Sequence, residues 1–197
     1  MEEKKLKVKD LVNIGIFSAL YMVVTMIAMM PAGLHPVIWL MWPGIAGILA
    51  GAFYTILMVK AKKPGSAFLL MLITGLLYFA TGECTWVIVV TTLVAGVVAE
   101  VVRKILGYDS FKGIALSGGV AAVGLIGSPL PMWLFQESYS QSIIDMGMSP
   151  EYVANFQTMI SPMSMAGMIV FALIGGIIGT LIGKKLLKKH FEKAGIV

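Results

Sequence analysis

Apolar residues fill six stretches of the chain, and charged residues or clusters of proline and glycine separate them. The stretches cover residues 10–30, 36–59, 65–81, 84–106, 111–135 and 161–187. A helix needs about 20 predominantly apolar residues to cross the hydrocarbon core of a bilayer. The pattern therefore predicts an all-α integral membrane protein, a six-transmembrane-helix bundle that forms one membrane domain over residues 1–197. The third stretch is the shortest, and Pro43 predicts a kink within the second.

Lysine and arginine fall on alternate connections between these stretches. The 15 residues are Lys4, Lys5, Lys7, Lys9, Lys60, Lys62, Lys63, Arg103, Lys104, Lys112, Lys184, Lys185, Lys188, Lys189 and Lys193. Six spans place all of them on one side of the membrane, whereas five or seven spans would divide them. Because cytoplasmic loops are enriched in lysine and arginine, the sequence predicts a cell-membrane protein with both termini in the cytoplasm.

The connections on the opposite, outward side carry acidic residues and include the only long connection, residues 136–160. Ser149 and Pro150 are typical of a helix start within it. The residues that follow at helical spacing would share one apolar face: Tyr152, Val153, Phe156 and Ile160. Since connections of this length are commonly lids or disordered segments, and this one is rich in aromatic residues, we expect a lid.

Composition separates this chain from soluble proteins. Hydrophobic residues make up 58% and charged residues 13% of its 197 positions, and the mean hydropathy is +0.92. Soluble domains carry about 25% charged residues. A soluble enzyme, a disordered chain and a sizeable extramembrane catalytic domain are therefore excluded. The net charge of +5 follows from the basic connections and does not indicate nucleic-acid binding.

The motifs of common enzymes do not occur in the sequence. It has no GxSxG or HExxH motif and no nucleotide-binding P-loop. Its one cysteine, Cys84, cannot form an intrachain disulfide. We therefore expect neither enzymatic activity nor a cofactor, and active transport would have to draw its energy from a partner.

All four tryptophans map to the outward ends of the predicted helices. They are Trp39, Trp42, Trp86 and Trp133. An aromatic belt at the membrane interface would need no ligand, whereas the aromatic walls of a pocket would stack on a flat ring. Both interpretations remain open. The lack of tryptophan at the cytoplasmic interface, where a belt would also be expected, favours the pocket.

Polar residues on the same side are candidate ligand contacts. Glu83 lies in the short turn before Trp86, where it is either solvated or accepts hydrogen bonds from a polar or cationic group of a substrate. Gln136 begins the long connection. His35, in the first outward connection, has a structural role or is a further ligand contact.

Methionine is abundant near the outward side. Of the 15 methionines, eight crowd the outward third: Met29, Met30, Met132, Met146, Met148, Met159, Met163 and Met165. Methionine is usually an adaptable apolar filler. A haem or soft-metal site with His35 and Cys84 is the alternative, although no residue spacing specifies one.

Small residues recur at four-residue intervals in three of the predicted helices. The sets are Gly15 and Ala19, Gly47 and Gly51, and Gly175, Gly179 and Gly183. Such spacing lets helix backbones approach closely, either within the bundle or against another membrane protein. The Gly15–Ala19 pair is the better candidate for a partner, because it lies in the cytoplasmic half of the first helix.

The segment from Lys9 to Leu20, KDLVNIGIFSAL, resembles the start of the Trep_Strep group of energy-coupling factor (ECF) S-components. Six spans in about 200 residues and a basic N-terminus are similar to the same superfamily. The resemblance implies a subunit that binds a micronutrient at its outward face and joins a transmembrane coupling subunit with two cytoplasmic ATPases. In S-components a small-x-x-x-small motif on the first helix meets the coupling subunit. Gly15 and Ala19 match it, with glycine in place of the usual first alanine.

The leading hypothesis is a substrate-binding subunit of an ECF-type importer for a small, ring-containing micronutrient. Glu83 and Gln136 would hydrogen-bond the substrate between tryptophan walls. A self-sufficient secondary transporter or channel is the second hypothesis, and a membrane enzyme or scaffold the third. Ion coupling would need ionisable groups near the midplane. Glu100 is too close to Arg103 and Lys104 for that, and we expect an ion pair there.

Overall fold

The computed structural model describes residues 5–188, and every regular element in this part of the chain is a helix. In order they are α1 (Val8–Met29), η1 (Met30–Leu34), α2 (Pro36–Lys60), α3 (Ser66–Ala80), α4 (Trp86–Leu106), α5 (Phe111–Val123), η2 (Gly124–Gly127), α6 (Pro131–Leu134), α7 (Gln136–Asp145), α8 (Pro150–Thr158) and α9 (Pro162–Leu186). The predicted all-α class is confirmed for these residues. Lys4, Lys189 and Lys193 lie outside them.

Four helical segments of the described chain are long and apolar enough to cross a membrane. They are Val8–Leu34, Pro36–Lys60, Trp86–Leu106 and Pro162–Leu186. Ser66–Ala80 and Phe111–Gly127 are apolar but shorter. At 1.5 Å per residue, a 15-residue helix such as α3 is about 22 Å long, below the ~30 Å of a hydrocarbon core. The six-span topology therefore stays a prediction.

The fifth predicted stretch, residues 111–135, is not one continuous helix. It divides into α5, the 3-10 helix η2 and the four-residue helix α6. Pro129 and Pro131 lack the backbone N–H that would continue the ladder of hydrogen bonds. Pro43, by contrast, is accommodated inside the uninterrupted helix α2.

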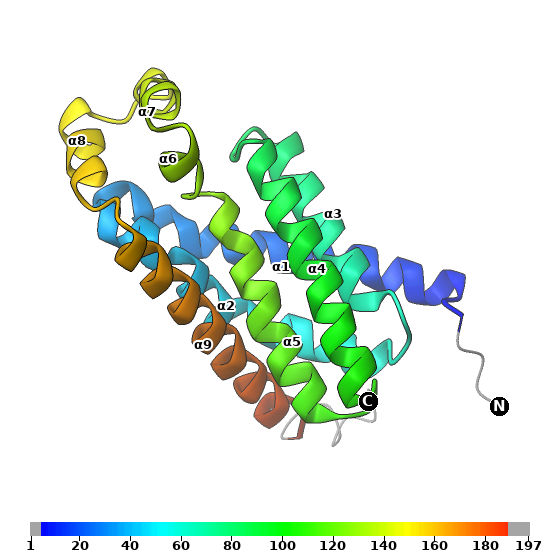
Figure 1. The fold of residues 1–197 in the computed structure, drawn as a ribbon. Coiled ribbons are helices and arrows are strands. Elements are labelled where there is room, and N and C mark those ends of the chain that lie inside the picture. Colours follow the sequence, from blue (N-terminus) through cyan, green and yellow to red (C-terminus); the bar gives the residue numbers. More distant parts are fainter. Residues whose placement is uncertain (1–4, 189–197) are drawn as a thin grey trace.

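Six helices pack in a closed ring. Going round it, α1 contacts α2, α2 contacts α9, α9 contacts α5, α5 contacts α4, α4 contacts α3, and α3 returns to α1. Figure 1 shows α2, α9, α5 and α4 running alongside one another, with α6, α7 and α8 gathered beyond one end. We call this end of the bundle the cavity end, because a cavity opens there.

Glycine permits close backbone contact between α2 and α9. A Cβ added at Gly179 would overlap the carbonyl oxygen of Gly47, and one added at Gly51 would overlap the backbone of Gly179. In an apolar solvent, helix association depends on such close packing. The small residues of the second and sixth stretches therefore serve packing within the bundle, which was one of the two interpretations of their spacing.

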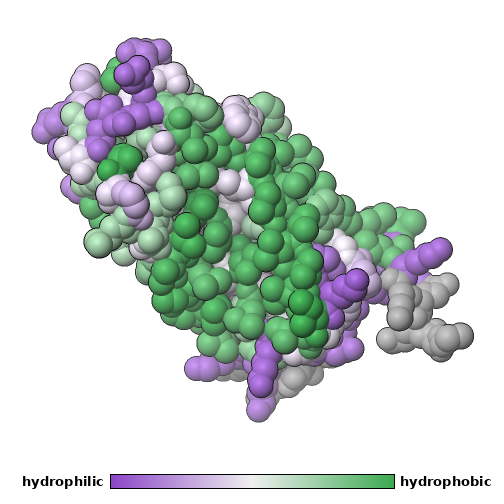
Figure 2. All heavy atoms as spheres, in the orientation of Figure 1, coloured by the Kyte–Doolittle hydropathy of each residue, from purple (hydrophilic) through white to green (hydrophobic). Residues whose placement is uncertain are grey.

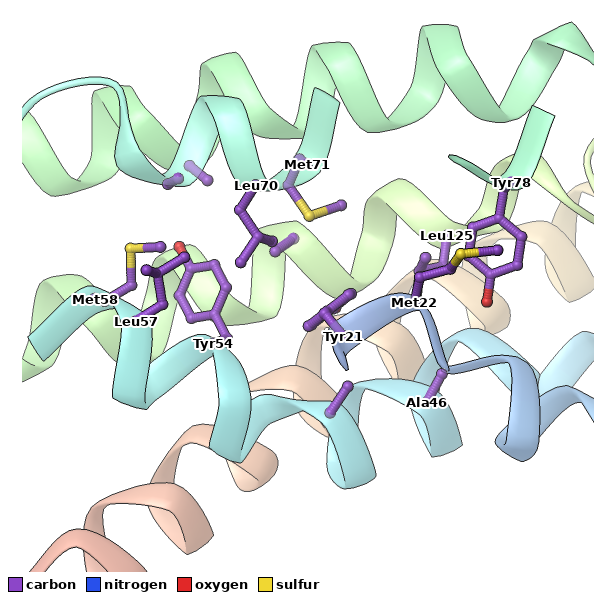
Figure 3. Packing of buried hydrophobic residues seen from close by; sticks show 14 of the residues in the cluster. Tyr21, Met22, Ala46, Tyr54, Leu57, Met58, Leu70, Met71, Tyr78 and Leu125 are labelled. Carbon is purple, nitrogen blue, oxygen red and sulfur yellow. The ribbon is translucent and has the colours of Figure 1, made fainter. Parts of the chain in front are cut away.

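The core combines apolar side chains with buried hydroxyl groups that have partners. Figure 3 shows part of the apolar cluster, to which α1, α2 and α3 contribute Tyr21, Tyr54, Leu57, Leu70 and Met71 among others. The Tyr54 hydroxyl donates to Ser117 Oγ at 2.8 Å. Thr25 Oγ1 and the Tyr78 hydroxyl are 2.7 Å apart, so this pair is hydrogen-bonded as well. Pairing of this kind removes the penalty for burying a polar group.

The basic connections meet at the end of the bundle opposite the cavity end. Three contacts join them: Lys63 Nζ lies 2.8 Å from Asp10 Oδ2, Lys62 Nζ lies 3.1 Å from Asp109 Oδ1, and Lys184 Nζ lies 4.3 Å from the ring centre of Phe111. Figure 2 shows a broad hydrophobic band across the visible face, with hydrophilic residues beyond both of its ends. We call this second end the basic end.

Glu100 does not form the predicted ion pair with Arg103 or Lys104 but caps the start of α3. Its carboxylate accepts hydrogen bonds from backbone N–H groups and a hydroxyl: Gly65 at 2.8 Å, Ala67 at 3.1 Å, Phe68 at 3.4 Å and Tyr108 Oη at 2.9 Å. N–H groups at a helix N-terminus have no intrahelical acceptor and favour an anion, and the carboxylate of Glu100 occupies this position. Arg103 is fully buried and donates to the carbonyl oxygens of Met58 and Tyr108, each at 3.2 Å.

Candidate functional site

A cavity of about 770 Å³ opens at the cavity end of the bundle. Its walls come from the last turns of α1, from η1, from the first half of α2, from the α3–α4 turn, and from α7 with the turn that follows it. Cavities of about 300–1,000 Å³ typically hold small-molecule ligands. Most of the lining is apolar, and the polar side chains gather on one side.

Trp39 forms the aromatic wall of this cavity. Its side chain is 5% exposed, and its ring lies 5.1 Å from that of Phe156, 6.3 Å from Tyr139 and 6.4 Å from Tyr152, measured between ring centres. Tilted aromatic pairs at these distances stabilise one another beyond their buried area. The cluster holds the indole of Trp39 in one orientation at the wall.

Ser128, between η2 and α6, ties this wall together from behind. Its Oγ accepts a hydrogen bond from Trp39 Nε1 at 3.1 Å, and its carbonyl oxygen accepts one from the Tyr139 hydroxyl at 3.1 Å. Burial raises the pKa of Tyr139, so its hydroxyl remains a donor at neutral pH. The break in the fifth stretch thus places a polar residue where both aromatic side chains can reach it.

The α3–α4 turn supplies the polar side. Glu83, Cys84 and Thr85 line the cavity in succession, and Thr85 also caps α4 by accepting a hydrogen bond from Val87 N–H at 3.4 Å. Glu83 is exposed at the rim, whereas Cys84 is 9% exposed. Burial raises the pKa of the Cys84 thiol to about 12, and a hydrogen bond with Ser128 opposes that shift only in part. The thiol is therefore protonated at neutral pH.

Methionine contributes much of the remaining wall. The methionines that line the cavity are Met26, Met29, Met30, Met146 and Met148. Unbranched and polarizable, methionine adapts to the shape of what it contacts and packs favourably against aromatic rings. This part of the wall can therefore fit a ring without specifying its outline.

The connection over residues 136–160 is folded and seated on the bundle. The helix expected from Ser149 and Pro150 is α8, and Ser149 Oγ accepts the predicted capping bond from Tyr152 N–H at 3.1 Å. The Tyr152 hydroxyl donates to the carbonyl oxygen of Ala32 at 2.7 Å, which attaches α8 to η1. The helix α7 was not predicted, and its Tyr139 and Ile143 form part of the cavity wall. We call α7 and α8 together the lid.

A second, smaller cavity of about 420 Å³ lies beside the first. Gly33, Gly147 and Met148 line both cavities. His35 and Glu151 line only the second. Gly33 of η1 and the turn between α7 and α8 therefore separate the second cavity, which we call the outer cavity, from the first, which we call the inner cavity.

Comparison with known protein families identifies the chain. A family model described as hypothetical bacterial integral membrane protein (Trep_Strep) matches residues 8–193. The chain belongs to the Trep_Strep family. Neither the curated proteins nor the solved structures contain a significant match. Together with the four long apolar helices, the family assignment establishes an integral membrane protein.

The structure of this Trep_Strep protein brings only some of the predicted site residues together. Trp39 and Glu83 line the inner cavity. His35 instead caps α2, where its Nδ1 accepts a hydrogen bond from Val37 N–H at 3.2 Å, and it lines the outer cavity. A His35–Cys84 metal site is therefore split between two cavities. Residues 5–188 contain no group of three or more histidine, cysteine, aspartate or glutamate side chains suited to hold a metal.

Four other predicted contacts lie outside the inner cavity. Trp42 is a core residue, fully buried, and its Nε1 donates to the carbonyl oxygen of Thr25 at 2.9 Å. Trp86 is 55% exposed beside Phe135. The remaining two are Trp133, whose Nε1 donates to the carbonyl oxygen of Ser161 at 3.1 Å, and Gln136, which is exposed at the start of α7. Helical phase separates Trp39 from Trp42, since residues three apart share a face only approximately.

Gly15 and Ala19 lie on a part of α1 that no other part of the described chain covers. A Cβ added at Gly15 would meet nothing within 4 Å, and Ala19 is exposed. This setting differs from that of Gly51 and Gly179, which are in backbone contact. The same four-residue spacing therefore has two roles in this protein, one internal and one on the surface of α1.

Sequence reasoning placed Tyr139 in the lid but not in the cavity wall, and it missed Ser128 altogether. Tyr139 stands in a segment whose helix was not predicted, and Ser128 lies in the break that was expected to be helical. The only available signal for Ser128 was its position in Gly127–Ser128–Pro129, where a turn was the alternative to a helix.

Proposed function

We propose that this Trep_Strep protein is the substrate-binding membrane subunit of an ECF-type importer, and that it captures a small, ring-containing micronutrient at its outward face. The observation that carries the proposal is the inner cavity. It combines ligand-sized volume, a fixed aromatic wall at Trp39, one carboxylate at Glu83 and a folded lid. Packing of the helices against one another would not by itself require a cavity of this size.

The position of the cavity supports uptake from outside. It lies at the end of the bundle opposite the basic connections, and the positive-inside rule assigns the basic end to the cytoplasm. In this topology both termini are cytoplasmic and the lid faces the exterior of the cell membrane. A ligand would enter under the lid and lie between Trp39 and the α3–α4 turn.

The energy for import would come from partners, as the resemblance implies. The chain has no P-loop, so a transmembrane coupling subunit and two cytoplasmic ATPases would supply it. The uncovered Gly15–Ala19 face of α1 supports this part of the proposal, since a smooth helix surface suits contact with another membrane protein.

Ligand capture is tested on the full-length protein purified in mild detergent. Small molecules that it retains from cells are identified by mass spectrometry and titrated back by isothermal calorimetry. Trp39→Phe shrinks the ring that faces the ligand, so we expect affinity to fall about tenfold, the upper range for one aromatic contact. Trp86→Phe, the same change outside the cavity, should leave affinity unchanged. No retained compound together with no binding across a vitamin panel would refute the proposal, and so would equal effects of the two variants.

Coupling is tested with a pair of glycines that both face open space. Gly15→Leu should abolish co-purification with the coupling subunit and ligand uptake, while ligand binding persists, because it adds bulk only to the uncovered face of α1. Gly167→Leu is the matched control, since a Cβ at Gly167 in α9 also meets nothing within 4 Å. Equal co-purification of the two variants would contradict the assignment of this face.

The secondary-transporter alternative makes an opposite prediction. Purified protein alone in liposomes would take up ligand if it were self-sufficient, but we expect uptake only after the coupling subunit, the ATPases and ATP are added. The engagement of Glu100 with the start of α3 supports this expectation, because four donors of the protein already occupy its carboxylate oxygens.

A further inference from the structure

Among the described residues, Glu83 supplies the one carboxylate that lines the inner cavity. The other polar side chains that line it are neutral: Cys84, Thr85, Trp39 and Tyr139. Within residues 5–188, no lysine, arginine or histidine belongs to the lining. A ligand inside this space therefore meets a single negative charge and no positive one.

The charged residues near the cavity but outside its lining are also acidic, so they add to the negative potential of Glu83. Between residues 113 and 183, and between residues 64 and 102, the sequence contains no lysine or arginine. These two segments supply the α3–α4 turn and the lid, and the lid carries Glu137, Asp145 and Glu151. A charged ligand approaching this end consequently crosses a region of negative potential, which attracts cations and repels anions.

The positive end of a helix dipole does not reverse this sign. The start of α4 lies next to Glu83, and a helix N-terminus corresponds to about half a positive charge. Thr85 already satisfies one of its N–H groups. The full charge of Glu83 therefore exceeds the partial charge of α4.

We infer that the inner cavity selects neutral or cationic ring compounds, with an amine, amidine or ring N–H directed at Glu83, and rejects carboxylates and phosphates of the same ring. The apolar, methionine-rich wall would accept the body of the ring, and Trp39 would face its plane. Bringing a carboxylate or phosphate into this space would require desolvation without a paired cation, which is costly. The inference rests on the proposed function, because it takes the cavity to be the ligand site.

The single cysteine allows the charge preference to be measured without knowing the ligand. Cys84 lines the cavity, and two thiol reagents of similar size differ in charge: trimethylammonioethyl methanethiosulfonate is a cation and sulfonatoethyl methanethiosulfonate is an anion. Both reagents react with the thiolate form of Cys84. The small fraction of Cys84 in this form lowers both rates equally, so it cancels in the ratio of the two rates. The corresponding ratio for free 2-mercaptoethanol removes the intrinsic difference between the reagents.

For the full-length protein in detergent we expect a cation-to-anion rate ratio about tenfold above the reference, from one unit charge within a few ångströms. Glu83→Gln should bring the ratio to within about twofold of the reference, whereas Glu137→Gln, on the exposed surface of α7, should change it little. If uncharged methyl methanethiosulfonate does not modify Cys84, the measurement moves to Met30→Cys in a Cys84→Ser background, since Met30 lines the cavity and is 78% exposed.

The outcomes separate this inference from the proposed function. A normalised ratio near one or below, or a high ratio that Glu83→Gln leaves intact, overturns the inference. Retention of an anionic ring compound by the purified protein also overturns it, and leaves the proposed function standing. A high ratio that depends on Glu83, in a protein that binds no compound and never joins a coupling subunit, supports the charge preference and refutes the proposed function.

Discussion

The cap that Glu100 places on α3 gives a sharp prediction about stability. In Glu100→Gln the side chain keeps its shape and one carbonyl oxygen. An NH2 group replaces the second oxygen, and the negative charge of the carboxylate is lost. In the native protein Oε1 accepts from Gly65 N–H and the Tyr108 hydroxyl, and Oε2 accepts from Ala67 N–H and Phe68 N–H. The variant can retain the first pair only as neutral hydrogen bonds. In the second pair, the NH2 group of the glutamine, itself a donor, would face the N–H donors of Ala67 and Phe68.

The expected loss follows from those four contacts. Hydrogen bonds to a charged group contribute about 1.5–3 kcal/mol each, and neutral ones about 0.5–1.5 kcal/mol. The two bonds to Oε2 are the longer ones, so we take about 1 kcal/mol for each, and about 0.5 kcal/mol for the lost charge assistance of each remaining bond. The free energy of unfolding should fall by about 3 kcal/mol, which corresponds to more than a hundredfold in the equilibrium constant.

Unfolding is followed by tryptophan fluorescence while the mole fraction of dodecyl sulfate is raised in mixed micelles. Asp109→Asn is the matched control, because it removes a carboxylate at the same end whose partner Lys62 is exposed, and an exposed pair contributes little. We expect about 0.5 kcal/mol for that variant. A loss below about 1 kcal/mol for Glu100→Gln, or one equal to the control, would refute the assignment of Glu100 as a cap.

Three further predictions follow from the packing, the topology and the buried thiol. Gly179→Ala should lower the free energy of unfolding by about 2 kcal/mol, because the added Cβ would overlap the Gly47 carbonyl oxygen. Gly15→Ala should not destabilise the protein, and similar free energies of unfolding for the two variants would contradict the close packing. In a Cys84→Ser background, a membrane-impermeant maleimide should label Glu137→Cys on intact cells and Lys62→Cys only after permeabilisation, and the reverse result would invert the topology. Because the pKa of the native Cys84 thiol is raised to about 12, its rate of reaction with iodoacetamide should rise about tenfold per pH unit from pH 8 to 10. The rate for the denatured chain should level off above about pH 9, and a plateau near pH 9 in the native protein would show an ordinary thiol.

The long, strongly apolar helices could be predicted closely from the sequence. The predicted range 36–59 became Pro36–Lys60, and 161–187 became Pro162–Leu186, because proline and serine at the start and lysine at the end mark their boundaries. The fifth stretch could not be predicted in this way. Its apolar composition continues through Gly124–Pro131, so hydropathy alone does not reveal that the backbone changes course there.

The candidate site could be predicted only in part from the sequence. A hydropathy pattern shows which end of the bundle a residue lies at, but not whether its side chain lines the cavity. Trp39 and Trp42 are three residues apart on α2, yet the first lines the cavity and the second is buried in the core. Glu83 could be found because it is an acid in an apolar neighbourhood. Glu100 had a cationic neighbour in sequence, but its backbone partners lie 32 to 35 residues away and Tyr108 lies eight residues away, beyond the reach of local spacing.

The place of α9 in the ring has a consequence for the order in which the protein assembles during synthesis. Translation delivers α9 after every other helix of the ring, yet it packs between α2 and α5. Until it arrives, α2 can pack against α1 and α5, and Gly47 can contact Ala122, but Gly51 lacks the Gly179 backbone against which it packs. The last helix to leave the ribosome is thus the one that completes the packing of α2, the helix that carries Trp39, and a ribosome stalled before it would leave one face of that helix uncovered.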